Sequence, residues 1–257
     1  MILAFDVGNS ETTVGLCDGL RVRKRWRITT DATRTPDEVF VTLVGLLGTS
    51  GVDRTKVRAS VIGSVVPAVT APLAEACKRL SGKRAIIVDG RSKLPITLDV
   101  DEPQTVGADR IANTLAASRL HKRDCIVVDL GTATTYDCIT ADGVFIGGVI
   151  APGVQMSAES LFRKTSKLPA TEIVPPKSVI GKRTEECIRA GVVLGSAEAI
   201  DGLVRRIKAA WPRRRTPRVI ATGGLAPAFA ELCGQFDEVD QDLTLKGLAM
   251  AYQLLDR

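Results

Sequence analysis

The feature that most constrains this sequence is a short acidic phrase that occurs twice, about half the chain apart. In the second copy, a run of branched apolar residues leads into Asp129, and a glycine and several threonines follow; the same order surrounds Asp6 near the start. Aligning the copies places Asp6 on Asp129, Gly8 on Gly131 and Thr12 on Thr135. Such an apolar run is typical of a strand buried on both faces. The repeat therefore predicts an internal duplication, with an acid at the end of a buried strand in each half.

Each acidic loop has the chemistry of a phosphate site. Glycine lets the backbone turn tightly and approach a ligand, and hydroxyl residues such as Thr132 supply further donors. Donors beside a carboxylate suit a phosphate that is bridged to a cation. One such loop is common in α/β proteins, whereas two copies predict two phosphate loops that face one another across a cleft.

Length and hydropathy bound the class of protein. The chain has 257 residues and is 45% hydrophobic, enough for one large or two modest domains. Only five residues precede Asp6, too few for a signal peptide, and no apolar run approaches the roughly 18 residues that cross a bilayer. We therefore expect a cytoplasmic protein that does not enter the membrane.

The cysteines and the single histidine restrict the chemistry. Six scattered cysteines form no Cys-x-x-Cys pair, which favours buried reduced thiols over disulfides or zinc. His121 is the only histidine and lies in a polar sequence expected to be a solvated helix end. Acid and base roles therefore fall to carboxylates, and a bound metal should be a hard cation held by Asp and phosphate oxygens.

The charge favours anionic small substrates over nucleic acid. The net charge is +6, with basic runs at residues 21–25 and 213–215 that suit a solvated strand edge and a loop. Aromatic residues make up 4% of the chain, which leaves little material for stacking bases. We therefore expect no nucleic-acid binding, and a basic surface suits nucleotides as ligands.

The order of elements predicts two similar α/β domains, residues 1–118 and 119–257. Each half begins with an antiparallel meander of three strands and continues with helices and further strands. Expected helices cover residues 37–47, 71–80, 156–164 and 243–255, with others starting near 107 and after Thr184 as N-cap. A stripe of Gly191, Gly195 and Ala199 indicates close helix packing within the chain, or a subunit contact. A strand at 218–222 ends in two glycines, whose bare backbone suits a ribose or heterocycle.

A second candidate site lies at Gly107-Ala108-Asp109-Arg110, where a helix is expected to begin. Asp109 in the first turn has a purely structural explanation, because an acid there is stabilised by the helix dipole by under about 1 kcal/mol. Two observations favour a ligand site instead. Arg110 follows directly, and Gly107-Ala108 offers almost no side chain to screen the carboxylate.

Five motifs together resemble the type III pantothenate kinases of the actin-like ATPase and sugar kinase superfamily. They run in order over nearly the whole chain: Asp6-x-Gly-Asn-Ser, Gly107-Ala-Asp-Arg110, Asp129-x-Gly-Thr-Ala-Thr-Thr135, Gly147-Gly-Val-Ile-Ala-Pro-Gly153 and Thr222-Gly-Gly-Leu225. No Gly-x-x-x-x-Gly-Lys-Ser/Thr occurs, which excludes the P-loop fold. The resemblance implies a duplicated ribonuclease-H-like (actin-like ATPase) fold, with two similar domains that each hold a mixed β-sheet flanked by helices.

The resemblance also implies an activity, its cofactors and its site. The activity is ATP-dependent phosphorylation of pantothenate to 4'-phosphopantothenate, the first step to coenzyme A, in a homodimer that uses Mg²⁺ and K⁺ or NH₄⁺. The implied ATP-binding residues are Asp6, Val7, Gly8, Asn9, Ser10, Glu11, Thr12, Thr13 and Thr132, with Asp6 near Mg²⁺. Gly107, Ala108, Asp109 and Arg110 bind pantothenate, and Asp109 is the proton acceptor. Asp129 binds the monovalent cation, and Thr184 contacts pantothenate from the other subunit, so its helix lies at the dimer interface.

Three positions depart from the family pattern. Val100 stands where many members have Tyr, Arg183 replaces the usual Asn before Thr184, and Ser10 replaces Thr but keeps the hydroxyl. Arg183 adds a charge beside an implied substrate contact, which bears on affinity and substrate identity. Two alternatives follow: a family member that has lost catalysis and acts as a regulator, or a superfamily kinase for another small alcohol.

Overall fold

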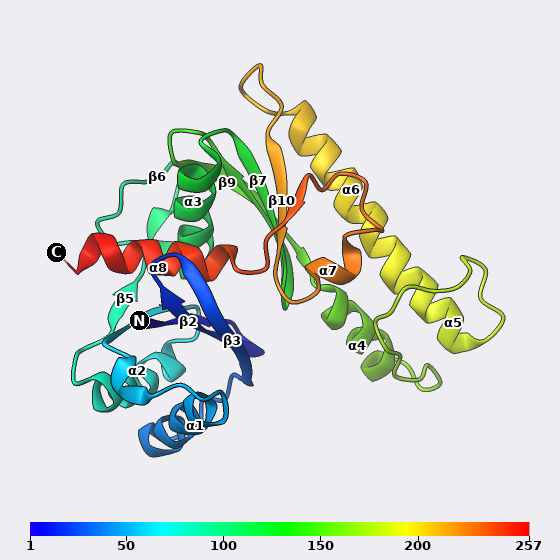
Figure 1. Ribbon diagram of the computed structural model, residues 1–257. Coiled ribbons are helices and arrows are strands. Elements are labelled where there is room, and N and C mark those ends of the chain that lie inside the picture. Colours follow the sequence, from blue (N-terminus) through cyan, green and yellow to red (C-terminus); the bar gives the residue numbers. More distant parts are fainter. Residues whose placement is uncertain (257) are drawn as a thin grey trace. The chain divides into compact units, whose positions relative to one another are not determined.

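The computed structural model describes residues 1–256, and its contacts divide the chain into two compact units (Figure 1). The first unit comprises residues 1–120 and 142–145 together with the chain from Asp242 onward. The second comprises residues 121–141 and 146–241. The C-terminal helix α8 (Leu243–Leu255), drawn in red, therefore belongs with the N-terminal elements. The expected boundary at residue 118, between two duplicated halves, stays a prediction.

The first unit holds a five-stranded mixed sheet in the order β3-β2-β1-β4-β5. Its strands are β1 (Ile2–Val7), β2 (Glu11–Asp18), β3 (Arg21–Thr29), β4 (Ala59–Ser64) and β5 (Ile86–Val88). The first three pair antiparallel, which confirms the expected meander, and β4 and β5 run parallel to β1. A bulge at Leu16/Cys17 shifts the register between β2 and β3 by one residue.

Helices cover both faces of this sheet because alternate side chains of its strands are apolar on each face. They are α1 (Pro36–Thr49), α2 (Pro67–Ser81), α3 (Ala108–His121) and α8 (Leu243–Leu255), with 3₁₀ turns at Arg54–Lys56 and Pro103–Thr105. Phe5 and Val14 share a core with Leu43 of α1, whereas Ala4 on the opposite face shares one with Ile111 of α3. The face that carries Ala4 is thus the face toward α3 and α8.

Glycines bring α8 close to this sheet. A Cβ at Gly15 would lie 2.8 Å from Leu245 Cδ1, and one at Gly63 would lie 2.8 Å from Leu248 Cδ2. A Cβ at Gly247 would overlap the carbonyl of Ala112 in α3. A Cβ at Gly15 or Gly63 would displace these leucine side chains, and one at Gly247 would force α8 away from α3.

The second sheet has the order β11-β10-β7-β8-β9-β6. Its strands are β6 (Thr97–Leu98), β7 (Cys125–Leu130), β8 (Ala133–Ile139), β9 (Val144–Pro152), β10 (Arg218–Thr222) and β11 (Glu238–Val239). β6 pairs with Val144 and Phe145 of β9, residues that group with the first unit. The helices are α4 (Val154–Lys164), α5 (Thr184–Arg189), the π-helical turn Ala190–Leu194, α6 (Gly195–Ala209) and α7 (Ala226–Phe229). The expected α/β class, with two mixed sheets flanked by helices, is confirmed.

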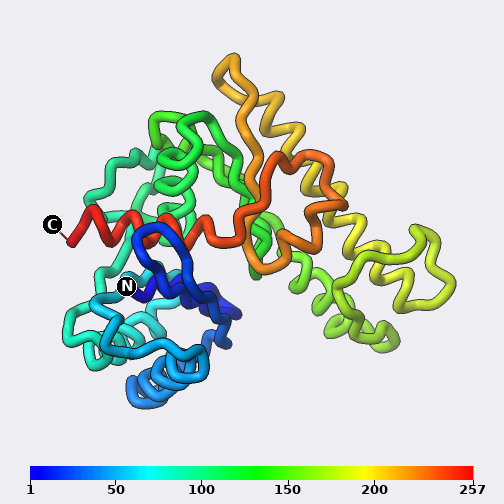
Figure 2. The backbone as a smooth tube through the Cα atoms, viewed as in Figure 1, coloured from blue at the N-terminus to red at the C-terminus, as the bar shows by residue number. Residues whose placement is uncertain are grey.

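In the long helix of the second unit, the expected N-cap is wrong, and one of the two interpretations of the glycine stripe is excluded. Thr184 is the first helical residue, Arg183 is the N-cap, and Glu186 accepts the Lys182 N–H at 2.8 Å. The path continues from α5 through the π-helical turn into α6 (Figure 2). Gly191 and Gly195 are exposed, and a Cβ at either would meet no atom within 4 Å among the described residues. The glycine stripe therefore does not serve packing within the chain.

The cysteines confirm the expected buried thiols, with one exception. All six are free, and only Cys187 is exposed. Burial raises the pKa of Cys17, Cys77, Cys125 and Cys233 to about 12, so these thiols stay protonated and inert. His121 ends α3 as expected, but its side chain is only 12% exposed, with Nδ1 3.9 Å from Glu238 Oε2. Among residues 1–256, no helix combines the length and apolarity needed to span a membrane.

Candidate active site

The first acidic loop joins β1 to β2 within the first unit. Asp6 is half-buried near the end of β1, where its register partners are Thr13 on β2 and Gly63 on β4. The loop is closed by the Gly8 N–H, which donates to the Glu11 carbonyl at 3.1 Å. Residues 9–11 at its tip are exposed. The structure thus presents a tight exposed turn beside a half-buried carboxylate, as the sequence predicted.

Strand alternation decides which side chains share a face with Asp6. Directly paired residues point to the same face of a sheet, and successive residues point to opposite faces. Asp6 and Thr13 therefore point to the face that carries Ala4, toward α3 and α8. Thr12, only 2% exposed, points to the other face. The carboxylate and the start of α3 lie on one side of the sheet.

The start of α3 places Asp109 at this same corner. The Gly107 carbonyl accepts the Ile111 N–H at 3.1 Å, and Asp109 Oδ1 accepts the Arg110 N–H at 2.9 Å. A Cβ at Gly63, the register partner of Asp6, would lie 3.3 Å from Ala108 Cβ. The first turn of α3 therefore packs on β4 at Gly63. Since adjacent strands are about 4.8 Å apart, this contact lies one strand away from Asp6. Asp6 and Asp109, 103 positions apart in sequence, are thus brought to one end of one sheet face.

A side chain at position 107 would crowd the carboxylate of Asp109. A Cβ there would overlap Asp109 Oδ1 and would lie 3.2 Å from Val65 Cγ1. The carboxylate of Asp109 therefore folds back over Gly107, and it is half-buried rather than enclosed. Gly107, two residues before Asp109, therefore leaves room for this carboxylate.

Arg110 is oriented by an aromatic ring. Its guanidinium carbon lies 4.8 Å from the centroid of Phe145, which is 1% exposed and pairs with Leu98 of β6. Such stacking uses the face of the guanidinium, whereas hydrogen bonds to a carboxylate use its in-plane N–H groups. The arrangement suits recognition of an anionic group near Asp109.

The second acidic loop joins β7 to β8 in the second unit. Asp129 is half-buried, and its register partners are Thr135 on β8 and Thr222 on β10. The Gly131 N–H donates to the Ala133 carbonyl at 3.1 Å and closes the turn. A Cβ at Gly153 would overlap the Thr132 carbonyl. Thr132 is half-buried, so the loop is tight but its threonine is accessible.

The glycine turn after β10 packs on this second carboxylate. Gly223 has φ +91°, a conformation that residues with a side chain rarely adopt, and a Cβ there would overlap Asp129 Oδ1. The expected third strand-end loop therefore lies directly at the second acidic loop. Thr184, the remaining implied substrate contact, is exposed at the start of α5 in the same unit.

The strand registers correct the alignment of the two copies. Asp6 pairs with Thr13, whereas Asp129 pairs with Thr135, so Thr135 corresponds to Thr13 and not to Thr12. The second loop is one residue shorter, which a gapless alignment of the sequence could not show. Thr134, at 3% exposed, then corresponds to Thr12.

The donor set suits a cation that is held mainly by phosphate. Within residues 1–256, no group of three or more His, Cys, Asp or Glu side chains gathers as a metal site. Mg²⁺ in phosphoryl-transfer enzymes usually takes one or two carboxylates and keeps waters and phosphate oxygens as its other ligands. One half-buried Asp beside a tight glycine turn fits that coordination.

Two residues of this region were not singled out from the sequence. Phe145 lies in the second meander, and nothing local links it to Arg110. Thr30 follows β3, and its N–H donates to the Ser10 carbonyl of the first loop at 3.0 Å. Thr30 lies just beyond the end of β3, and its place beside the first loop depends on the bulge at Leu16/Cys17, which the sequence does not show.

Comparison with known proteins places the chain in a family. The family described as type III pantothenate kinase matches residues 2–206. A type III pantothenate kinase of Anaeromyxobacter sp. (strain K) is 42% identical over 255 residues, which cover 98% of this chain and 99% of that protein. Its counterpart in Desulfatibacillum aliphaticivorans is 42% identical over 253 residues and 98% of both chains.

Solved structures agree on the fold. A Campylobacter jejuni protein described as a conserved Baf family transcriptional activator superposes with a TM-score of 0.60 at 19% identity, covering 98% of each chain. MreB 5 of Spiroplasma citri, solved with AMPPNP, superposes with a TM-score of 0.55 at 10% identity, covering 99% of this chain and 96% of that one. At these identities the likeness concerns the fold alone, and it confirms the actin-like architecture expected from the sequence.

Proposed function

The chain belongs to the type III pantothenate kinase family, and on that premise we propose how its own residues carry out the reaction. The activity is that of a pantothenate kinase, which transfers a phosphoryl group from ATP to an alcohol. The observation that carries the proposal is the corner of the first unit, where Asp109 and Asp6 belong to the same end of the same sheet face.

Asp109 is proposed as the residue that orients the pantothenate hydroxyl and accepts its proton. Phosphoryl transfer is mostly positioning and charge neutralisation, so an acid can serve by aiming the nucleophile. Gly107 leaves the Asp109 carboxylate uncovered, and Arg110, stacked on Phe145, offers N–H donors to the substrate. Together these residues would fix the orientation of the substrate hydroxyl.

The acidic loops are proposed to bind the phosphates and cations. Backbone N–H groups of the exposed turn at residues 9–11 and the Thr13 hydroxyl would hold ATP phosphates in the first unit. Asp6 would hold Mg²⁺ together with phosphate oxygens, and Asp129 would hold K⁺ or NH₄⁺. Bound Mg²⁺ would neutralise charge on the transferred phosphoryl group. Thr132 of the second loop is proposed as a further nucleotide contact.

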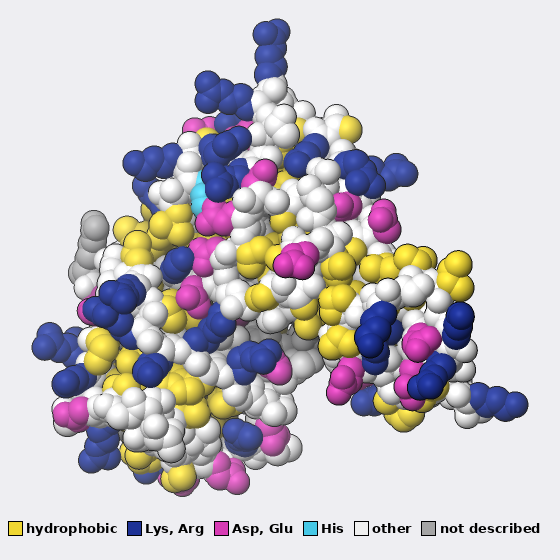
Figure 3. All heavy atoms as spheres, turned by 45° about the vertical axis from the view of Figure 1, so that its right-hand side comes forward, with side chains coloured by type: hydrophobic (Ala, Val, Ile, Leu, Met, Phe, Trp, Pro, Cys, Tyr) yellow, Lys and Arg dark blue, Asp and Glu magenta, His cyan; other side chains and the backbone are white. Residues whose placement is uncertain are grey.

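A homodimer is the proposed assembly. Exposed apolar side chains gather in the second unit, including Met156 and Phe162 of α4 and Val179 and Ile180 before α5. Yellow side chains are grouped at the right of Figure 3, while Lys and Arg are interspersed with acids over the face drawn. An exposed apolar surface beside Thr184 fits an interface that brings this residue to a partner. Analytical ultracentrifugation should give twice the chain mass of 27.4 kDa.

The test of the function is ADP release coupled to a reporter enzyme, with pantothenate, pantetheine and simple sugars offered separately, each with and without K⁺. We expect ADP release that depends on pantothenate and is stimulated by K⁺. Release with a sugar alone would assign another alcohol as substrate. No release with any acceptor, while ATP still binds, would indicate a regulator.

A further inference from the structure

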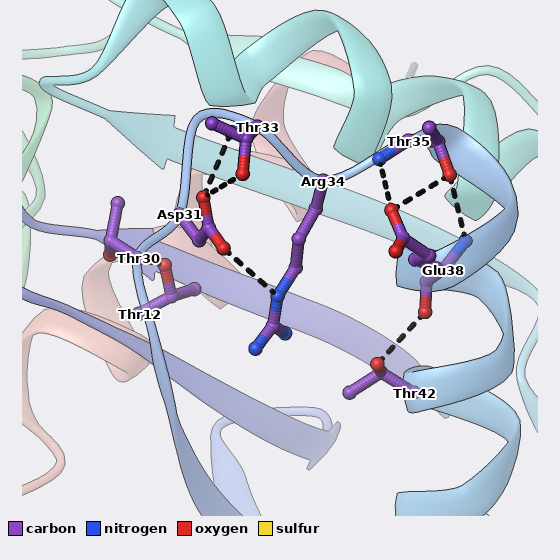
Figure 4. Close-up of polar contacts among 8 residues, drawn as sticks. All are labelled: Thr12, Thr30, Asp31, Thr33, Arg34, Thr35, Glu38 and Thr42. Carbon is purple, nitrogen blue, oxygen red and sulfur yellow. Dashed lines mark hydrogen bonds and ion pairs between the residues drawn. The ribbon is translucent and has the colours of Figure 1, made fainter.

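Thr30 contacts the first acidic loop twice. Its N–H donates to the Ser10 carbonyl at 3.0 Å, and its Oγ1 lies 2.9 Å from Thr12 Oγ1 in a hydrogen bond between hydroxyls. Thr12 pairs with Ile28 across β2 and β3, so Thr30 is its diagonal neighbour on the same face. Figure 4 shows the two threonines next to each other where β3 leaves the sheet.

The chain that follows Thr30 is fixed by its own hydrogen bonds. Asp31 Oδ1 accepts the Thr33 N–H at 2.9 Å and the Thr33 hydroxyl at 2.6 Å, which forms a closed turn. Glu38 accepts the Thr35 N–H at 2.8 Å and completes the cap of α1 (Figure 4). Thr30 therefore lies between the end of β3 and a segment whose own hydrogen bonds lead into α1.

The Thr12 hydroxyl points away from Asp6. Asp6 and Thr13 face α3 and α8, whereas Thr12 is 2% exposed on the face toward α1 and α2. Thr134, its counterpart in the second loop, is likewise buried at 3% exposure. A hydroxyl buried on the far face and bonded to Thr30 is poorly placed to contact a phosphate beside Asp6.

We propose that Thr12 and Thr30 form a positioning pair that holds the loop from Gly8 to Glu11 in shape for the phosphates of ATP. The pair acts through the Ser10 carbonyl and the Thr12 backbone, and Thr13 is the hydroxyl that faces the nucleotide. This inference rests on the proposed role of the first loop in binding ATP.

A double-mutant cycle tests the pair. Thr12→Val, Thr30→Val and the double variant are compared by the Kd for MgATP from calorimetric titration and by separate KM values for ATP and pantothenate. Each single change should weaken ATP binding about threefold to tenfold, the effect of one hydrogen bond. The double change should be no worse than either single one, because each already breaks the shared bond. KM for pantothenate should stay within twofold.

Two further variants separate positioning from simple stability. Thr30→Ser keeps the hydroxyl and should restore wild-type ATP affinity, and Thr30→Ala serves where valine disturbs the fold seen by circular dichroism. Thr42→Val is the matched control, because the Thr42 hydroxyl bonds only the Glu38 carbonyl of its own helix among the contacts in Figure 4. It should leave ATP binding unchanged.

Two results would overturn the positioning role of Thr12 and Thr30. The first is losses of ATP affinity that multiply in the double variant, and the second is a lowered melting temperature with an unchanged Kd for ATP. Wild-type protein that binds MgATP but does not phosphorylate pantothenate would instead overturn the proposed function. The Kd cycle still decides the role of Thr30 in that case.

Discussion

In the first unit the carboxylate of Asp6 lies between β2 and β4, and the first turn of α3 approaches through Ala108. In the second unit Asp129 lies between β8 and β10, and the bare backbone of Gly223 packs against its side chain. The two loops thus share a sequence phrase and a closing glycine hydrogen bond but differ in what approaches the acid. A helix start that bears a second carboxylate suits chemistry on a substrate, whereas a glycine turn suits a bound cation and the ribose or heterocycle of a nucleotide.

Among the changes that compare the two loops, the largest expected effect contrasts the two acids. Asp6→Asn should lower kcat on the order of 10²–10³-fold and raise the Mg²⁺ concentration for half-maximal rate, because it removes the charge beside the phosphates. Asp129→Asn should instead raise the K⁺ requirement, with a smaller loss of kcat at saturating K⁺. Activity titrated with each ion checks this. A changed K⁺ response in Asp6→Asn together with a changed Mg²⁺ response in Asp129→Asn would contradict the comparison.

The glycine that packs on Asp129 should be the next most sensitive position. Gly223→Ala forces a side chain into a backbone with φ +91° and against Asp129. We expect a loss of about 1–3 kcal/mol in unfolding free energy, together with weakened K⁺ activation. Gly19→Ala, also at positive φ but with no atom within 4 Å of the new Cβ among the described residues, is the control for backbone strain alone. Equal effects of both changes on K⁺ activation would argue against a cation role for Asp129.

Phe145→Leu probes the substrate side of the first unit. Removing the ring beneath Arg110 should raise KM for pantothenate about twofold to tenfold, the strength of one cation–π contact, with KM for ATP unchanged. Phe145→Tyr keeps a ring and should restore the value if its hydroxyl is accommodated. A uniform fall in kcat without a change in KM would show that Phe145 serves the core rather than Arg110.

The smallest effect is a pH dependence near the first loop. Hydrogen bonds from the Thr35 N–H and hydroxyl lower the pKa of Glu38 below its ordinary value of 4.5. The unfolded chain therefore binds more protons in acid, so this contribution to stability is complete above that value and is lost as pH falls through the folded-state pKa. Glu38→Gln should make the melting temperature depend less on pH over about pH 3–5. An unchanged slope would show that the cap contributes nothing to acid sensitivity.

The fold was readable from sequence where the signal was local. The apolar run before Asp129 predicted a buried strand, and the spacing of apolar residues from 243 to 255 predicted α8. Both acidic loops, and the glycine before Asp109, followed from turn chemistry. These features depend on residues that are neighbours along the chain.

What sequence missed depends on register and on contacts between distant residues. One extra residue in β3, Arg23, lies opposite Leu16/Cys17 and shifts the β2–β3 pairing, which changes the neighbours of Thr12. The one-residue difference in loop length hid the match between Thr13 and Thr135. The ring of Phe145 in β9 meets Arg110 in α3, although the two residues are far apart in the sequence. No local sequence pattern predicts the bulge, the difference in loop length or the contact between Phe145 and Arg110.

The most direct test of the central claim, that the corner holding Asp6 and Asp109 performs the transfer, is the kcat of Asp109→Asn with pantothenate and ATP at saturation. The account predicts a folded protein with unchanged ATP affinity and a kcat lower by roughly 10²–10⁴-fold. A folded variant whose kcat stays within about threefold of wild type would remove Asp109 from the mechanism and contradict the account.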